Sequence, residues 1–94
     1  MKMVKLQDHE QAQAHVRIEP NKIVLVSYTT DVIIARKALG YAWVLEVTGL
    51  YSNTTKRHIS WFMKEYFPSR NYYEIKEGMQ DDLLIIAKLE KEVV

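Results

Sequence analysis

The sequence predicts one α+β domain, with a small antiparallel sheet of about three to five strands and a helix packed across it. Residues 22–48 are rich in β-branched side chains, and short polar or glycine-containing segments divide them. An amphipathic stretch follows and runs up to Pro68. The 94 residues, of which 48% are hydrophobic and 27% charged, suffice for a single core, so we expect one domain over 1–94.

The first twenty residues are the least regular part of the chain, and we expect a poorly defined segment over 1–20. Residues 4–6 suit the start of a short strand. Residues 8–14 suit a loose helical turn or a surface segment. The alternation of apolar and charged residues over 16–19 indicates a short extended piece, which a turn at Pro20 ends.

The middle of the chain predicts strands over 22–28, 32–35 and 41–48, with reversals at 29–31 and at Gly40. In the third stretch large residues alternate with smaller or polar ones, which is typical of a half-buried strand with Trp43 on its richer face. Connections this short favour an antiparallel meander, because parallel strands need a long crossover.

A helix is predicted to begin among the hydroxyl and amide side chains of residues 52–55 and to end before Pro68. Its core-facing side is predicted from residues at helical spacing, namely Thr55, Ile59, Phe62, Met63 and Tyr66.

Two interpretations are open for the C-terminal part. Residues 71–77 alternate and predict an edge strand, which Gly78 ends. Residues 83–86 would suit a buried strand, yet the apolar residues between Met79 and Val93 recur at helical spacing. We therefore predict a helix over 79–92.

Composition excludes several classes of function. The chain has no cysteine, which excludes disulfides, thiol catalysis and cysteine-ligated zinc. Its three glycines lie too far apart for a phosphate-binding or dinucleotide-binding loop, and no serine sits in a nucleophile elbow. His9 and His15 lack the spacing of metal ligands. We expect a protein that is not an enzyme and needs no cofactor or metal.

The net charge of +1 indicates no global attraction to nucleic acid or membranes. The N-terminus lacks the apolar core of a signal peptide, and no apolar run approaches the roughly 20 residues of a membrane span. We expect a cytoplasmic protein without membrane contact.

The start of the predicted helix is the strongest candidate site. A helix N-terminus offers unpaired N–H groups and partial positive charge, and two cations and flat rings lie beside it here, so phosphates and bases could bind. Tyr51 is one such ring. The candidate binding residues are Ser52, Thr54, Thr55, Lys56, Arg57, His58 and Trp61. Helix capping alone, which contributes about 1 kcal/mol, explains the hydroxyl residues equally well.

Two stretches carry a resemblance to a known group of proteins. Ser27-Tyr28-Thr29-Thr30, and then Tyr51-Ser52-Asn53-Thr54-Thr55-Lys56-Arg57-His58-Ile59, resemble the SYxT and YSxTTxxHI motifs of small uncharacterised proteins of phages and mobile elements. The resemblance covers residues 22–67. It implies a phage- or plasmid-borne accessory protein in the host cytoplasm, and it implies no activity. A structural role for the motif is also open, because His58 could bond to the turn at 28–30 and fix the helix to the sheet.

Two functional hypotheses follow from these observations. In the first, the chain binds nucleic acid through residues 52–58 and Trp61. In the second, it binds a protein, either as an inhibitor of a host or defence protein or as a homo-oligomer, which its balanced charge and six tyrosines suit.

Overall fold

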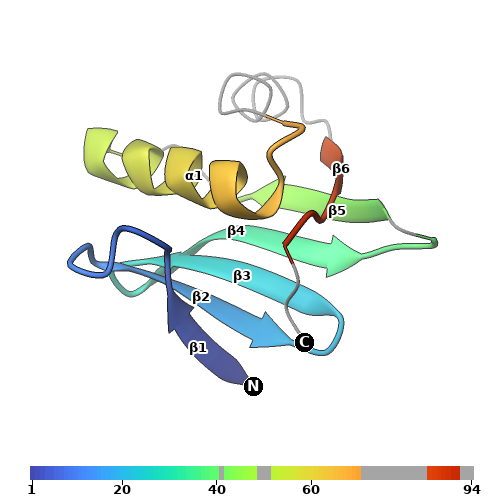
Figure 1. Ribbon diagram of the computed structural model, residues 1–94, viewed down its shortest axis with the longest axis horizontal. Coiled ribbons are helices and arrows are strands. Elements are labelled where there is room, and N and C mark those ends of the chain that lie inside the picture. Colours follow the sequence, from blue (N-terminus) through green and yellow to red (C-terminus); the bar gives the residue numbers. More distant parts are fainter. Residues whose placement is uncertain (41, 49–51, 71–84, 92–94) are drawn as a thin grey trace.

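A computed structural model describes residues 1–40, 42–48, 52–70 and 85–91 (Figure 1). In this part of the chain a six-stranded antiparallel sheet carries one helix, α1, across one face. The strands pair in sequence order, which confirms the predicted meander. The elements are β1 (Lys2–Lys5), β2 (Ala14–Glu19), β3 (Lys22–Ser27), β4 (Thr30–Lys37), β5 (Ala42–Val47), α1 (Asn53–Tyr66) and β6 (Ile85–Lys88).

The sheet is larger than the sequence predicted. Two of its strands, β1 and β2, come from the first twenty residues, where only short extended pieces were expected. The two strands pair antiparallel, with Val4 opposite Val16. Residues 8–13, between them, form turns rather than a helix. The N-terminal segment therefore contributes ordered strands to the domain.

The predicted C-terminal helix is wrong where the structure describes that segment. Residues 85–88 form β6, which pairs antiparallel with β5 and places Ala87 opposite Trp43. Exposed Ile86 and Lys88 alternate with the buried Ala87, which is the period of a strand. The edge of β5 offers unpaired backbone groups, and this long-range pairing overrides the local helical spacing. The strand predicted over 71–77 and the start of the C-terminal helix at 79–84 lie outside the described residues.

The helix has the predicted limits, and local chemistry explains both. Ser52 is the N-cap, with extended backbone angles (φ −61°, ψ 166°), and its Oγ accepts from the Thr55 N–H at 3.4 Å. At the other end the Phe67 N–H donates to the Met63 carbonyl just before Pro68, which cannot continue the helix. The predicted core-facing residues of the helix are all buried.

The core lies between the sheet and α1. On β3, Ile23 and Leu25 face the helix. Phe62 projects from α1 into the same core. Aromatic rings fill the part of the core near the C-terminal end of α1. The ring centroids are 5.0 Å apart for Phe62 and Tyr66 and 6.3 Å apart for Trp43 and Phe67. The fully buried side chains include Leu6, Val16, Ile23, Leu25, Ile33, Phe62, Tyr66 and Phe67.

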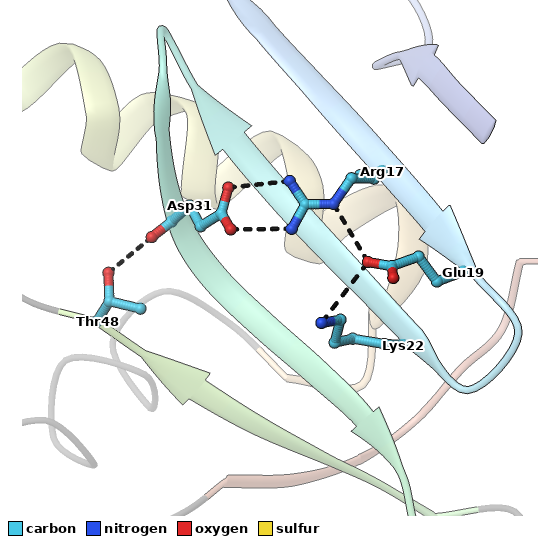
Figure 2. A network of polar contacts seen from close by, with 5 residues as sticks. All are labelled: Arg17, Glu19, Lys22, Asp31 and Thr48. Carbon is cyan, nitrogen blue, oxygen red and sulfur yellow. Dashed lines mark hydrogen bonds and ion pairs between the residues drawn. The ribbon is translucent and has the colours of Figure 1, made fainter. Parts of the chain in front are cut away.

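The opposite face of the sheet carries charges that neutralise one another (Figure 2). Arg17 on β2 reaches across β3 and makes a bidentate ion pair with Asp31 on β4, at 3.2 and 2.9 Å. Its Nε also donates to Glu19, which in turn pairs with Lys22 at 3.7 Å. No helix among the described residues covers this face of the sheet, yet Val24 on β3 is fully buried. Val24 is the cross-strand partner of Arg17, whose long side chain passes over β3 at this point.

Candidate functional site

A buried polar cluster joins the first turns of α1 to the end of β3. Ser27 is the last residue of β3, and its Oγ lies 2.8 Å from His58 Nδ1 and 3.1 Å from Thr55 Oγ1. All three side chains are at least nine-tenths buried. Thr55 Oγ1 also lies 3.5 Å from the hydroxyl of the cap residue Ser52. The hydroxyl groups and the imidazole therefore satisfy one another and fix the helix to the sheet.

The environment of His58 disfavours its charged form. Burial lowers the pKa of His58 below its usual range, and the positive charges of Arg57 and His9 lower it further. The neutral ring shares one proton with Ser27 through Nδ1, and which of the two atoms donates depends on the tautomer. A structural role for His58 was one of the two sequence interpretations. Its hydroxyl partner is Ser27, one residue before the turn that was expected.

Four rings form a row along one flank of the helix. Tyr28 lies 5.8 Å from His58, His58 lies 5.6 Å from Trp61, and His9 stacks on Trp61 at 3.7 Å with an interplanar angle of 10°. The row runs from the β3–β4 loop across the helix to the β1–β2 loop. Both loops lie at the same end of the sheet, near the start of α1 (Figure 1), and the Tyr28 N–H donates to the Gln13 carbonyl.

Tyr28 has an unusual backbone. It is the first of two residues that connect Ser27 to its partner Thr30, and its φ is +56°. Glycine, asparagine and aspartate are preferred where a hairpin loop needs a positive φ, and another L-residue there costs on the order of 1 kcal/mol. The side chain of Tyr28 is 54% exposed, so burial offsets little of that cost.

The outer face of α1 (Thr54, Arg57, Ser60 and Lys64) is exposed to solvent and carries the cations Arg57 and Lys64. The first turn contains no acidic residue. The single carboxylate of the helix, Glu65, accepts from the Gln7 backbone N–H and pairs with Lys91. Lys56 is half-buried on another side, because consecutive helical residues lie about 100° apart. The helix thus presents Arg57 and Lys64 together and Lys56 separately.

Ion pairing divides the basic residues that the structure describes. Four basic residues elsewhere are paired with carboxylates, namely Arg17, Lys22, Arg36 and Lys91. Lys56, Arg57 and Lys64 have no ion pair among the described residues. Lys2, Lys5, Lys37 and Lys88 also lack an ion pair among these residues, so what distinguishes Arg57 and Lys64 is that they share one exposed face of a helix.

The seven predicted site residues therefore separate into two groups. Thr55 and His58 point inward, and Trp61 is half-buried with one ring face covered by His9. The exposed members are Ser52, Thr54 and Arg57, with Lys56 half-buried. Tyr51, a predicted stacking ring, lies outside the described residues.

Three residues of this region were not among the predicted site residues. Ser27 completes the buried cluster, Tyr28 begins the row of rings, and Lys64 extends the cationic face. The spacing of Arg57 and Lys64, seven residues apart on one helical face, was a signal in the sequence. No pattern in the residues adjacent to Tyr28 predicted that its ring is exposed.

The described residues offer neither a cluster of metal ligands nor a membrane-spanning helix. No group of three or more histidine, aspartate or glutamate side chains is arranged to hold a metal ion in that part of the chain. None of its helices has the length and apolar character needed to cross a membrane.

Comparison with known proteins identifies one match. Neither the curated proteins nor the solved structures include a significant match to this chain. One family model, described as a family of unknown function (DUF8033), matches residues 2–78. The matched span includes β1 to β5 and α1, and it extends beyond the residues 22–67 that carry the motif resemblance. The chain belongs to this family of unknown function, DUF8033.

Proposed function

We propose that this chain is a non-enzymatic nucleic-acid-binding module that contacts phosphates through the outer face of α1. The observation that carries the proposal is that Arg57 and Lys64 are exposed there and have no ion pair among the described residues. In keeping with the motif resemblance, we propose an accessory role in a phage or mobile element, inside the host cell.

The chemistry of the helix suits phosphate binding. Arg57 and Lys64 are separated by about two turns, roughly 10 Å along the axis, so they can contact different phosphates of one strand. Arg57 provides a planar fork of donors and Lys64 a point charge. Thr54, one turn before Arg57 and His58, adds an exposed hydroxyl. Near the N-terminus of α1, Lys56 and Arg57 oppose the helix dipole, which costs a few tenths of a kcal/mol, and a bound anion would offset that cost.

The buried cluster has a supporting part in this proposal. Ser27, Thr55 and His58 hold the start of α1 against β3, so the cations are presented from a fixed helix. Positioning of the backbone before binding lowers the entropy lost on association.

Charge reversal on the helix tests the proposal. We expect fluorescence anisotropy with labelled oligonucleotides to show binding by the wild type. We expect Arg57→Glu combined with Lys64→Glu to weaken that binding at least about tenfold, because two phosphate contacts become repulsive. Lys2→Glu combined with Lys37→Glu changes the net charge equally at two exposed positions on β1 and β4 and should retain most of the affinity. Equal losses in the two variants would show a nonspecific charge effect and refute the site.

A protein-binding role is the second candidate, and the observation that favours it is the face of the sheet that no described helix covers. Two ion pairs on this face, Arg17 with Asp31 and Arg36 with Glu46, are made within the chain, so a protein partner could cover them without separating either pair. The partner would be a host protein or a second copy of the chain. Light scattering after size-exclusion chromatography tests the second copy, and a concentration-independent monomer mass would argue against it.

A further inference from the structure

We propose that the bound nucleic acid is single-stranded and that one of its bases stacks on the exposed ring of Tyr28. This inference rests on the proposed function, and it adds the class of ligand and the residue that recognises it. Three properties of Tyr28 support it, namely its backbone conformation, its exposure to solvent and its neighbouring residues.

The backbone of Tyr28 is the first observation. A two-residue hairpin loop with a positive φ at its first position is most easily made with glycine, yet a large aromatic residue occupies the position here. The loop does not need the tyrosine ring to close, because Ser27 and Thr30 are already paired in the ladder. Strained residues of this kind gather at sites of function.

The surroundings of the ring are the second observation. Among the described residues its one aromatic contact is with His58, at 5.8 Å and a tilt of 45°, and 54% of the residue remains in solvent. The Tyr28 N–H is bonded to Gln13, and its chain neighbour Ser27 is bonded to the helix. The backbone beneath the ring is thus held from both sides while the ring itself stays accessible, which suits a stacking platform.

The charges around the row of rings favour a nucleic acid strand as the occupant. Thr54 and Arg57 precede His58 and Trp61 by one helical turn, so they border the row on the helix side. Asp8 and Glu10 flank His9 at the opposite end and are exposed, so phosphates are repelled from that end. We infer that the backbone of the strand follows Arg57 and Lys64 while a base turns toward Tyr28.

Stacking on Tyr28 requires a base that is free of its neighbours. In a duplex both faces of each base are covered within the stack, whereas an unpaired strand leaves them available to aromatic side chains. DNA and RNA share this chemistry, and the sugar is left to the experiment.

The test compares Tyr28→Gly with Tyr28→Phe. Glycine removes the ring and relieves the backbone, so the fold should be retained or strengthened while binding of single strands is weakened. Phenylalanine keeps the ring and should retain binding. Leu39→Gly, which removes a side chain that is 95% exposed in the β4–β5 loop, is the matched control for losing an exposed apolar group. Anisotropy is measured with labelled oligothymidine, with oligouridine of the same length and with a duplex of that length.

We expect the wild type to bind a single strand at least about tenfold more tightly than the duplex, and Tyr28→Gly to lose about tenfold on the single strands with its melting temperature unchanged or raised. The ratio between oligothymidine and oligouridine identifies the preferred sugar. Salt-dependent binding that is equal for duplex and single strand would overturn this inference and leave the proposed function standing. Binding of no oligonucleotide would overturn both. A Tyr28→Gly protein with a lowered melting temperature would show that the ring serves the fold, and would also overturn the inference.

Discussion

Replacing Ser27 with alanine tests whether the buried cluster fixes the helix to the sheet. The serine hydroxyl contacts His58 Nδ1 at 2.8 Å and Thr55 Oγ1 at 3.1 Å, and all three side chains are buried. Alanine leaves both partners without this hydroxyl, and a buried polar group that loses its partner costs about 1–3 kcal/mol. Thr55 keeps a contact with Ser52 at 3.5 Å, so most of the loss comes from His58. We expect Ser27→Ala to lower the free energy of unfolding by about 1–3 kcal/mol.

A loss of that size is easily measured, because small domains are stable by only about 5–15 kcal/mol. Urea unfolding followed by tryptophan fluorescence and by circular dichroism gives the free energy of unfolding. Ser60→Ala is the matched control, since Ser60 lies on the same helix and is exposed. We expect a change within about 0.5 kcal/mol for this control.

A double-mutant cycle separates the contact from the serine itself. Ser27→Ala and Thr55→Val should couple, so that the double variant is less destabilised than the sum of the two single variants, by about 0.5 kcal/mol or more. A Ser27→Ala protein as stable as the Ser60→Ala control would refute the role of the cluster. Strict additivity in the cycle would refute the contact between Ser27 and Thr55.

Two further predictions concern buried titratable groups. The hydroxyl of Tyr66 is buried without a hydrogen-bond partner among the described residues, and burial raises the pKa of Tyr66 to about 12. Tyr66→Phe removes this unpartnered hydroxyl and should raise the free energy of unfolding, measured in urea, by about 1 kcal/mol. A loss of stability would instead reveal a partner for the hydroxyl. The pKa of His58 is lower in the folded state than in the unfolded state, so the unfolded state binds a proton more readily. The free energy of unfolding should therefore fall as the pH drops below about 6.5, by at most about 1.4 kcal/mol per pH unit. His58→Gln should reduce this dependence between pH 7.5 and 5.5 and the control His15→Gln should retain it, whereas the same slope in all three proteins would contradict the prediction.

The limits of the helix could be read from the sequence because they depend on nearby residues. The hydroxyl of Ser52 caps the first turn, and Pro68 prevents continuation after Phe67. The central strands were also predicted, because their alternation matches a sheet with one face on a core. The strand at 85–88 was predicted as a helix, because its conformation depends on the edge of β5, whose paired residues lie 40 to 46 positions earlier in the chain.

The candidate site shows a similar division between local and long-range information. Placing Thr55 on the core-facing side of the helix was correct, since that follows from helical spacing. The same spacing separates Lys56 from Arg57 by about 100°, so the two cations that are adjacent in sequence do not act at one point. The partner of His58 and the exposure of Tyr28 depend on how the helix sits on the sheet, and no local pattern contains that information.

The salt dependence of binding tests the central claim most directly, because it counts phosphate contacts. For a single strand, each neutralised phosphate contributes about −0.7 to the slope of the logarithm of the association constant against the logarithm of the salt concentration. With labelled oligothymidine, we predict a clearly negative slope for the wild type and a slope about 0.7 less steep for Arg57→Gln. A wild-type slope near zero, or an Arg57→Gln slope equal to that of the wild type, would contradict phosphate binding by the outer face of α1.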